Sequence, residues 1–370
     1  MKLMVFHPTL DGFVIEWVHH LCTYKPSNVE LYFCMPEGYE NTIKQCGTDK
    51  INYVVIPQSD TEYINTGSNL FCSYKRARLV ARMAKQYDID EILILVYLSV
   101  LPFILYFLPS KTSISGIVHS IYLYKWNGMS LKEKLFNILT YKSLAVCRKS
   151  KSVFMLNDEC SSCYLNRKFK SQKFKLLPDP FKENSTKRTD LRAKLGIEPH
   201  ESIYLHFGGL TYRKGTYKIL EAIYCLTPEE SRGKCFVFAG RISKALRDNF
   251  YSLYNQLKEH HHIILIDEFC EEEFLHDLCY TSDFILIPYD YTSVSSGVIG
   301  FAAYYGKPVI GPAAGLQGKL IRRFRLGMRL PHNNVAELKS AICKIPVYHI
   351  KSEYVKRMEI CNFTQVIYSK

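Results

Sequence analysis

The 370-residue sequence lacks an uninterrupted apolar run of the roughly 20 residues that a helix needs to cross a bilayer. The stretch 92–108 contains seventeen residues without a charge, but Pro102 lies in its middle. Strands that are covered on both faces also read as continuous apolar runs. We therefore interpret the stretch as a buried parallel strand, ILILVYL, followed by a loop and a short apolar helix, in preference to a spanning helix.

Paired cysteines and metal-ligand clusters are also missing. The thirteen cysteines are an odd number, and the chain enters a strand pattern without a secretory leader, so we expect a reducing cytoplasm and no disulfide framework. Cys160 and Cys163 lack a second pair at zinc spacing. On a strand, His260, His261 and His262 would point to alternate faces, so no metal site is expected there.

Acidic residues are outnumbered, with 48 Lys+Arg against 35 Asp+Glu and a net charge of +13, which implies an anionic partner. Before residue 180 the excess lies in residues 142–175, which hold nine basic residues and two acidic ones. A surface that contacts anionic phospholipid and a merely solvated face explain this segment equally well. No aromatic-interleaved sheet or reader-helix motif accompanies the charge, so nucleic acid is not an expected partner.

The order of the apolar runs predicts an α/β protein with two domains. Short apolar runs alternate with helical periods up to the sequence LLPDPF, and the same βαβα rhythm restarts after it. We expect two Rossmann-like domains with doubly wound parallel sheets, at residues 1–180 and 181–346, and helices at 347–370. Two such sheets would face a cleft with their carboxyl edges, where ligands of these sheets bind.

The first candidate binding segment is LHFGGLTYRKGTYKILEAI, residues 205–223. A strand is followed by Gly208 and Gly209, and Arg213 and Lys214 stand where a helix opens. Backbone N–H groups, a helix dipole and an ammonium would then surround one anion, as in a diphosphate cradle. Neither GxxxxGK[ST] nor GxGxxG is present, and a plain turn with solvated Arg213 and Lys214 remains the alternative.

A second candidate segment covers residues 282–315. A buried strand ends at Pro288, a polar loop follows, and Ser295, Ser296 and Gly297 lead into a helix of small residues. Serine hydroxyls and the bare backbone at Gly297 would let a phosphate or a sugar approach a helix N-terminus at the carboxyl edge of the sheet.

Together these segments resemble the GT-B glycosyltransferases, most closely family 4 (glycosyl transferases group 1), retaining enzymes that use nucleotide sugars. Five matches occur in the family's order: Gly208 to Gly215, FVFAG at 236–240, the strand and helix through Asp283, SGV at 296–298 and GKPVIG at 306–311. In the first domain, Gly12 in the first βα loop and His119 at a strand end are similar to functional positions of the family. The resemblance also implies that residues 347–370 cross back to the first domain.

Three positions depart from the family's pattern. The Arg that usually follows the first Gly of the cradle is Gly209 here, and Arg213 or Arg241 would have to supply its charge. The family's two glutamates, eight residues apart, fall on Ser293 and Phe301. In the family the second glutamate grips the ribose hydroxyls and the first lies near the donor sugar, so ribose recognition here must use other groups.

The resemblance implies a glycosyltransferase, the unpaired cysteines predict a cytoplasmic one, and the basic segment 142–175 allows a peripheral position on the inner face of the membrane. It would move a hexose-type sugar, with retention, from a nucleoside diphosphate to a glycan or lipid-linked acceptor in bacterial surface polysaccharide synthesis. Its catalytic candidates are His119 and Lys214. Its donor-binding candidates are Gly12, Gly208, Gly209, Arg213, Lys214, Arg241, Ser293, Ser295, Ser296, Gly297 and Val298. His119 fits a hydrogen-bonded histidine at a strand end equally well.

We expect neither a cofactor nor a metal, because no Asp-x-Asp stands at a strand end and Lys214 with a helix dipole can neutralise a diphosphate. The alternative function is that of a non-catalytic GT-B protein that binds a glycan or a partner glycosyltransferase, which Gly209, Ser293 and Phe301 allow. An epimerase of GT-B form is disfavoured, because the sequence has none of its paired acidic and histidine loops.

Overall fold

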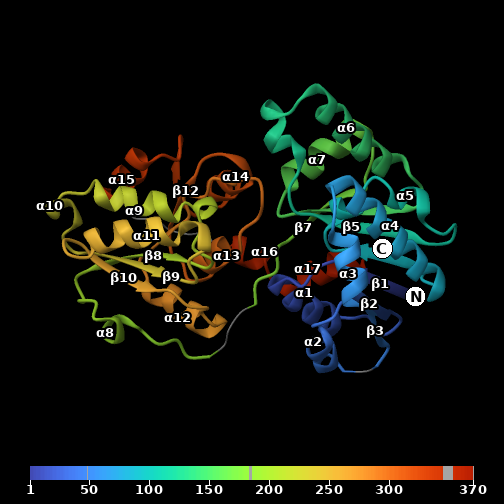
Figure 1. The fold of residues 1–370 in the computed structure, drawn as a ribbon, viewed down its shortest axis with the longest axis horizontal. Coiled ribbons are helices and arrows are strands. Elements are labelled where there is room, and N and C mark those ends of the chain that lie inside the picture. Colours follow the sequence, from blue (N-terminus) through green and yellow to red (C-terminus); the bar gives the residue numbers. More distant parts are fainter. Residues whose placement is uncertain (48, 183–185, 345–352, 370) are drawn as a thin grey trace. The chain divides into compact units, whose positions relative to one another are not determined.

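The computed structural model describes the whole chain except residues 48, 183–185, 345–352 and 370 (Figure 1). The chain forms two compact units, Met1–Asp179 together with Ile360–Lys370, and Pro180–Glu359. Part of the segment predicted at 347–370 lies outside the described residues. In its described part, α16 (Glu353–Arg357) belongs to the second unit and α17 (Ile360–Tyr368) to the first.

The first unit is built on a parallel sheet with the strand order β3-β2-β1-β4-β5-β6-β7. Its strands are β1 (Lys2–Phe6), β2 (Glu30–Pro36), β3 (Ile51–Ile56), β4 (Glu91–Ile94), β5 (Ser113–Val118), β6 (Ser150–Leu156) and β7 (Phe174–Leu177). Strand β1 pairs with β2 on one side and with β4 on the other, so the order reverses there. The loops that leave the carboxyl ends of β1 and β4 therefore diverge, which makes this edge the expected place for a ligand.

Helices cover both faces of this sheet. They are α1 (Gly12–Thr23), α2 (Glu40–Gln45), α3 (Gln58–Asn65), α4 (Asn69–Gln86), α5 (Ile104–Phe107), α6 (Leu131–Val146), α7 (Glu159–Phe169) and α17, with the 3₁₀ helices η1 (Tyr97–Ser99) and η2 (Tyr122–Gly128). Helices α3 to α7 pack in one apolar cluster, and α1, α2 and α17 in another. Alternate residues of β1 pack into the two clusters, Met4 and Phe6 into the first and Leu3 and Val5 into the second. This follows from the pleat of a strand, which points successive side chains to opposite faces of the sheet.

The uncharged stretch 92–108 begins as a buried strand and ends in a short helix, as predicted, but the strand ends at Ile94, four residues before the end of the predicted run ILILVYL. Its first part belongs to β4, all four residues of which are buried, and its last part forms η1 and α5. The two faces of β4 are covered by the two clusters, which is why the run reads as continuously apolar. Within the described residues, no helix is long and apolar enough to cross a membrane.

The second unit has a parallel sheet with the strand order β10-β9-β8-β11-β12-β13. Its strands are β8 (Ser202–Phe207), β9 (Lys234–Ala239), β10 (His262–Ile266), β11 (Phe284–Leu286), β12 (Val309–Pro312) and β13 (Gly327–Leu330). Its helices are α8 (Arg192–Leu195), η3 (Tyr212–Lys214), α9 (Thr216–Tyr224), α10 (Pro228–Ser231), α11 (Lys244–Leu257), α12 (Glu272–Thr281), α13 (Gly297–Tyr304), α14 (Gly315–Phe324), α15 (Val335–Cys343) and α16. Strand β8 pairs with β9 and with β11, so the order reverses at β8 and β11.

The three consecutive histidines do not share one strand. Only His262 lies in β10, where its Nδ1 is 2.8 Å from Oε1 of Glu201, whereas His260 and His261 precede the strand. The prediction that all three stand on a strand is therefore wrong, because the turn after α11 extends further than the apolar pattern indicates. No cluster of metal-binding side chains is found among the residues that the structure describes.

Candidate functional site

The ends of β8 and β9 meet backbone to backbone in the second unit. Gly208 follows β8 with φ +88°, and Gly240 follows β9 with φ +135°, a region that favours glycine. A Cβ on Gly240 would lie only 2.0 Å from the carbonyl oxygen of Gly208. Any side chain at residue 240 would force the two strand ends apart, so the shape of the turn depends on this glycine.

The turn after β8 folds Lys214 back over its own start. The hydroxyl of Thr211 accepts a hydrogen bond from the backbone N–H of Lys214 at 3.2 Å, which closes η3. The Lys214 Nζ then lies 2.6 Å from the position that a Cβ on Gly208 would take. Gly215, with φ +70°, is the N-cap of α9, and a Cβ there would lie 2.3 Å from the carbonyl oxygen of Pro288. The first candidate segment therefore abuts the loop of the second.

The Lys214 ammonium is half-buried and lacks an acidic partner in the part of the chain that the structure describes. Burial, and to a smaller extent the neighbouring positive charge of Arg213, lowers the pKa of Lys214 from 10.5 to about 8. A cation that is desolvated and has no counter-ion gains most from an incoming anion. This is the electrostatic property that a diphosphate site needs.

Tyr289 joins the two candidate segments, and the sequence did not single it out. Its ring lies with its centroid 5.7 Å from the Lys214 Nζ, and it is 4% exposed. Burial raises the pKa of Tyr289 to about 12, while the nearby Ser296 side chain and the charge of Arg213 act in the opposite direction. Lys214, Arg213 and Ser296 are therefore gathered around one buried ring at the carboxyl edge of the sheet.

Helix α13 begins at this place. Ser296 precedes it with an extended backbone, φ −138° and ψ 121°, and its side chain does not cap the helix. A Cβ on Gly297 would meet no heavy atom within 4 Å, so the space beside the first turn is open. The first N–H groups of a helix have no intrahelical partner and carry the positive end of the helix dipole. The start of α13, including Val298, is suited to an anion.

The two positions where the family has glutamates are filled differently. Ser293 is 5% exposed. The ring of Phe301 lies 4.9 Å from that of Phe181, 5.5 Å from that of Phe207 and 4.8 Å from that of His276, between ring centroids. Phe301 therefore anchors α13 to the end of β8 through an aromatic cluster, where a carboxylate would be poorly solvated.

Arg241 follows Gly240 at the carboxyl end of β9. Its backbone carbonyl accepts a hydrogen bond from the N–H of Leu210 at 2.9 Å, and its exposed guanidinium lies 5.9 Å from the centroid of the Phe269 ring. The structure thus places Arg241 at the strand next to the turn that carries Lys214. Both predicted sources of extra positive charge, Arg213 and Arg241, lie at this edge.

A buried histidine that sequence reasoning missed supports the turn. In β8, Nδ1 of His206 is 2.8 Å from the carbonyl oxygen of Leu286, so it donates. The other ring nitrogen, Nε2, accepts from the hydroxyl of Thr216 at 2.9 Å, and the Thr216 oxygen accepts from the N–H of Thr211 at 3.1 Å. Burial lowers the pKa of His206 to about 4, which keeps the ring neutral. This relay fixes the start of α9 against β8 and β11.

In the first unit, His119 follows β5 directly. Its Nε2 donates to the carbonyl oxygen of Leu95 at 2.8 Å, and its ring stacks on that of Trp17 with centroids 5.5 Å apart. Burial lowers the pKa of His119, and the Leu95 hydrogen bond opposes this. Gly12 is the first residue of α1. Both sequence candidates of this unit therefore follow the carboxyl ends of the two strands that flank β4, namely β5 and, through the β1 loop, β1.

Asp11 is the acidic group of this edge, and it was also missed. Its Oδ2 accepts from the Thr9 hydroxyl at 2.7 Å and lies 2.8 Å from Nε2 of the buried His7. Burial alone would raise the pKa of Asp11, but the bonds from Thr9 and His7 outweigh it and lower the pKa. Asp11 is 43% exposed as a side chain, so an ionised carboxylate is available here. The only sign of Asp11 in the sequence is the HxTxD pattern after β1. This pattern does not indicate a site until the structure shows that the His7 ring contacts the Asp11 carboxylate.

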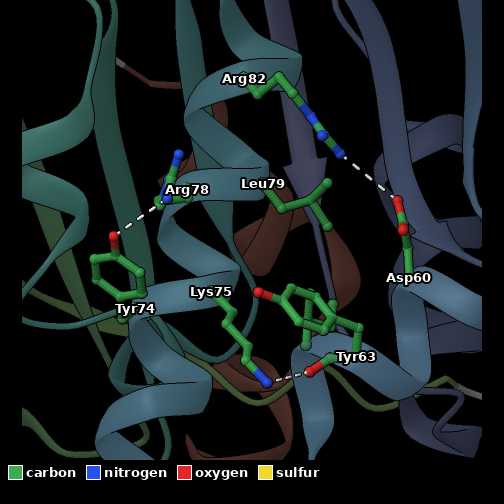
Figure 2. A pocket seen from close by; sticks show the side chains of 8 residues that line it. Asp60, Tyr63, Tyr74, Lys75, Arg78, Leu79 and Arg82 are labelled. Atoms are coloured by element: carbon green, nitrogen blue, oxygen red, sulfur yellow. Dashed lines mark hydrogen bonds and ion pairs between the residues drawn. The ribbon is translucent and has the colours of Figure 1, made fainter.

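A separate hollow of about 310 Å³ lies between α3 and α4 (Figure 2). Its three cations already have partners. Lys75 donates to the carbonyl oxygens of Tyr63 and Thr66 at 2.8 and 3.0 Å. Figure 2 shows Arg78 directed at the Tyr74 hydroxyl, at 3.2 Å, and Arg82 at Asp60, at 3.6 Å. The Lys75 and Arg82 contacts link α4 to α3 and to the residue that follows α3, whereas the Arg78 contact lies within α4, so we assign this hollow a structural role.

Solved structures of glycosyltransferases share this fold. HepE of Anabaena, solved with UDP and glucose, matches with a TM-score of 0.67 and 14% identity over 99% of this chain and 98% of its own. WaaG, a glycosyltransferase involved in lipopolysaccharide biosynthesis, matches with 0.65 and 14% over 100% and 96%. A UDP-forming α,α-trehalose-phosphate synthase from Burkholderia vietnamiensis matches with 0.68 and 9% over 99% and 98%.

These matches confirm the predicted fold class, because two parallel-sheet units of this kind make up the GT-B fold. No protein-family model matches the chain, and no curated protein matches its sequence. The likeness to glycosyltransferases therefore lies in the fold of the chain.

Proposed function

We propose that the chain is a glycosyltransferase that takes its sugar from a nucleoside diphosphate sugar. The observation that carries this proposal is the Lys214 ammonium, whose pKa burial lowers to about 8 and which lies over Tyr289 beside the open start of α13. The GT-B fold supports it, since a structure with that fold was solved with UDP and glucose.

In the proposed mechanism, Lys214 stabilises the negative charge that builds on the leaving diphosphate, with help from Arg213. Preorganised donors in a partly desolvated site are most effective at this step. The backbone groups of Ser296, Gly297 and Val298 hold the phosphates at the N-terminus of α13. Because an ammonium and a helix dipole supply the neutralising charge, we propose that the chain needs neither metal nor cofactor.

The acceptor side of the proposal rests on the first unit. His119 and the backbone at Gly12 would contact the sugar or an acceptor hydroxyl, and the ionised Asp11 carboxylate offers a hydrogen-bond acceptor next to Gly12. By resemblance the acceptor is a glycan or a lipid-linked glycan of bacterial surface polysaccharide synthesis, and the anomeric configuration is retained. We propose a cytoplasmic protein that acts at the inner face of the membrane.

The basic segment 142–175 is the proposed contact with that membrane. Three of its cations also stabilise the fold: Lys149 donates to the Leu108 carbonyl at 2.8 Å, Lys173 to the Cys147 carbonyl at 2.6 Å, and Lys151 lies 3.3 Å from Glu91. The exposed ones are Lys142, Arg148, Lys151, Arg167, Lys168 and Lys170. Each exposed Lys or Arg near an anionic leaflet contributes about 1 kcal/mol to binding.

The direct test is a calorimetric and turnover panel of UDP-, GDP-, TDP- and CMP-sugars. We expect one nucleotide to bind and its sugar conjugate to be transferred or slowly hydrolysed. A second function has a specific observation in its favour, since neither Ser293 nor Phe301 can act as the family's glutamates do. A chain that binds a glycan or a partner protein but no nucleotide would establish that non-catalytic function and end the present proposal.

Gly209→Arg should increase the affinity for the diphosphate. A Cβ on Gly209 meets no heavy atom within 4 Å, so the added side chain has room. A charged hydrogen bond to phosphate should tighten UDP binding about tenfold, or about 1.4 kcal/mol. Isothermal calorimetry measures this, with Gly209→Gln as the uncharged control. A folded Gly209→Arg protein that binds UDP no better than Gly209→Gln would place the diphosphate elsewhere.

A further inference from the structure

Helix α6 has apolar side chains on two opposite sides. One side is buried against the sheet and consists of Thr140, Tyr141, Leu144 and Ala145. The other side is open to solvent, with Leu131 83%, Leu135 58%, Phe136 46%, Leu139 55% and Val146 65% exposed. A surface helix of a globular protein normally carries polar residues on its outer face. The apolar side chains on the outer face of α6 are not buried by folding, so their presence there indicates another role.

The exposed residues form one stripe. At about 100° per residue, Leu131, Leu135, Leu139 and Val146 fall within an arc of about 80°, directly opposite the buried side, and Phe136 borders it. The stripe follows the helix for about 23 Å, at about 1.5 Å per residue. We call these five residues, with Phe136 included, the α6 stripe. Apolar surface gathered in this way marks an interaction site more often than scattered exposed residues do.

The stripe is formed before any partner binds. Ser130 and Glu133 cap the start of α6 with reciprocal hydrogen bonds, Glu133 N–H to Ser130 Oγ at 3.3 Å and Ser130 N–H to Glu133 Oε2 at 2.7 Å. The buried side anchors the helix, since Tyr141 and Leu144 belong to the main apolar cluster of the unit. A partner would thus bind a helix that is already ordered, so binding would not lose the conformational entropy of folding that helix.

Cations lie on α6 and on the neighbouring helix α7. Lys132 and Lys142 are exposed and fall on the outer side of α6, at its two ends. The Lys134 Nζ lies 5.1 Å, and the Lys168 Nζ of α7 5.9 Å, from the centroid of the Trp126 ring. The basic segment continues from the end of α6 with Arg148. An apolar centre with a cationic rim is complementary to an anionic bilayer surface, which offers acyl chains below a layer of phosphates.

We propose that α6 is a membrane-interfacial helix whose stripe inserts among the acyl chains of an anionic leaflet, while the lysines around it contact lipid phosphates. This inference rests on the membrane contact proposed above and names the element that enters the lipid. It does not depend on sugar transfer. The occupant is a bilayer and not a protein, because the charged residues on the outer side of α6, Lys132 and Lys142, are both positive, whereas Glu133 falls on the opposite side of the helix and caps its start.

Flotation of the full chain with vesicles tests this inference. Vesicles of phosphatidylcholine alone and vesicles that also contain phosphatidylglycerol are compared. Wild type should float with the anionic vesicles, and Leu135→Asp/Leu139→Asp should lower the bound fraction about tenfold or more, because two carboxylates replace inserted apolar groups. Lys132→Gln/Lys142→Gln should weaken binding to the anionic vesicles only. Tyr224→Asp, at a residue 63% exposed in the second unit, should bind like wild type.

Two outcomes would overturn the inference. One is Leu135→Asp/Leu139→Asp floating like wild type. The other is a wild-type dimer in light scattering that the same double variant converts to a monomer, since the stripe would then be an interface between two copies. UDP binding is measured on the same samples. Loss of vesicle binding with intact UDP binding, or the reverse, separates a failure of this inference from a failure of the proposed glycosyltransferase function.

Discussion

Lys214→Met should reduce sugar transfer about 100-fold or more while it leaves the melting temperature within about 2 °C of wild type. Methionine keeps most of the apolar stem and removes the only charge of the residue. The lost interaction acts on the leaving diphosphate, which carries more negative charge in the transition state than in the bound donor. The rate of transfer under saturating donor measures the effect.

Lys194→Met is the matched control for this variant. Lys194 is an exposed lysine on α8 of the same unit, before β8 and so near the amino end of that strand. Its replacement should leave both the rate and the melting temperature unchanged. A Lys214→Met protein with normal transfer would remove Lys214 from the reaction, and one that unfolds would show a structural role instead.

The pH dependence has a defined sign. The ammonium is charged below its pKa of about 8, so affinity for UDP should fall as the pH rises through that value. The stability of the free protein should move the other way. Between pH 8 and 10.5 the unfolded chain binds a proton that folded Lys214 has lost, so the free energy of unfolding rises with pH. Lys214→Arg, which stays charged, should remove the fall in affinity.

Gly240→Ala should cost about 3 kcal/mol or more of the free energy of unfolding. The new Cβ would lie 2.0 Å from the carbonyl oxygen of Gly208, and alanine strongly disfavours φ +135°. Rotation of a side chain cannot relieve either problem, because the clash is with a backbone oxygen and the strain lies in a backbone dihedral angle. Denaturant unfolding followed by circular dichroism measures the loss.

Gly209→Ala, one residue along the same turn, serves as the control. Its Cβ meets no heavy atom within 4 Å and its φ lies outside the positive region, so the change should stay within about 0.5 kcal/mol. Equal stability of the two alanine variants would contradict the close approach of the β8 and β9 ends.

The order of elements and the two glycine-containing turns could be predicted from the sequence, because they depend on local patterns. Buried parallel strands read as apolar runs, so β4 was found inside an uncharged stretch that is almost long enough to span a membrane. Gly208 and Lys214 were found because turn and helix-start residues stand in one short segment.

The supporting residues of the site could not be predicted, because their partners lie far along the chain. Nothing near Tyr289 in the sequence indicates that its ring will lie beside Lys214. His206 looks like an ordinary member of an apolar strand until the strand order brings the Leu286 carbonyl next to it. The three consecutive histidines show the limit of local patterns at an element boundary, because His260 and His261 precede β10 and only His262 belongs to it.

The neutral relay beneath the turn has a consequence for how the site titrates. His206 has a pKa of about 4, so its ring does not change charge anywhere near neutrality, and the Thr216 hydroxyl to which it is bonded does not ionise there either. The groups that support the turn therefore keep the same charge over that range of pH. The curve of UDP affinity against pH, once corrected for the ionisation of UDP itself, should then follow a single proton, with the slope of one independent group and no cooperative step.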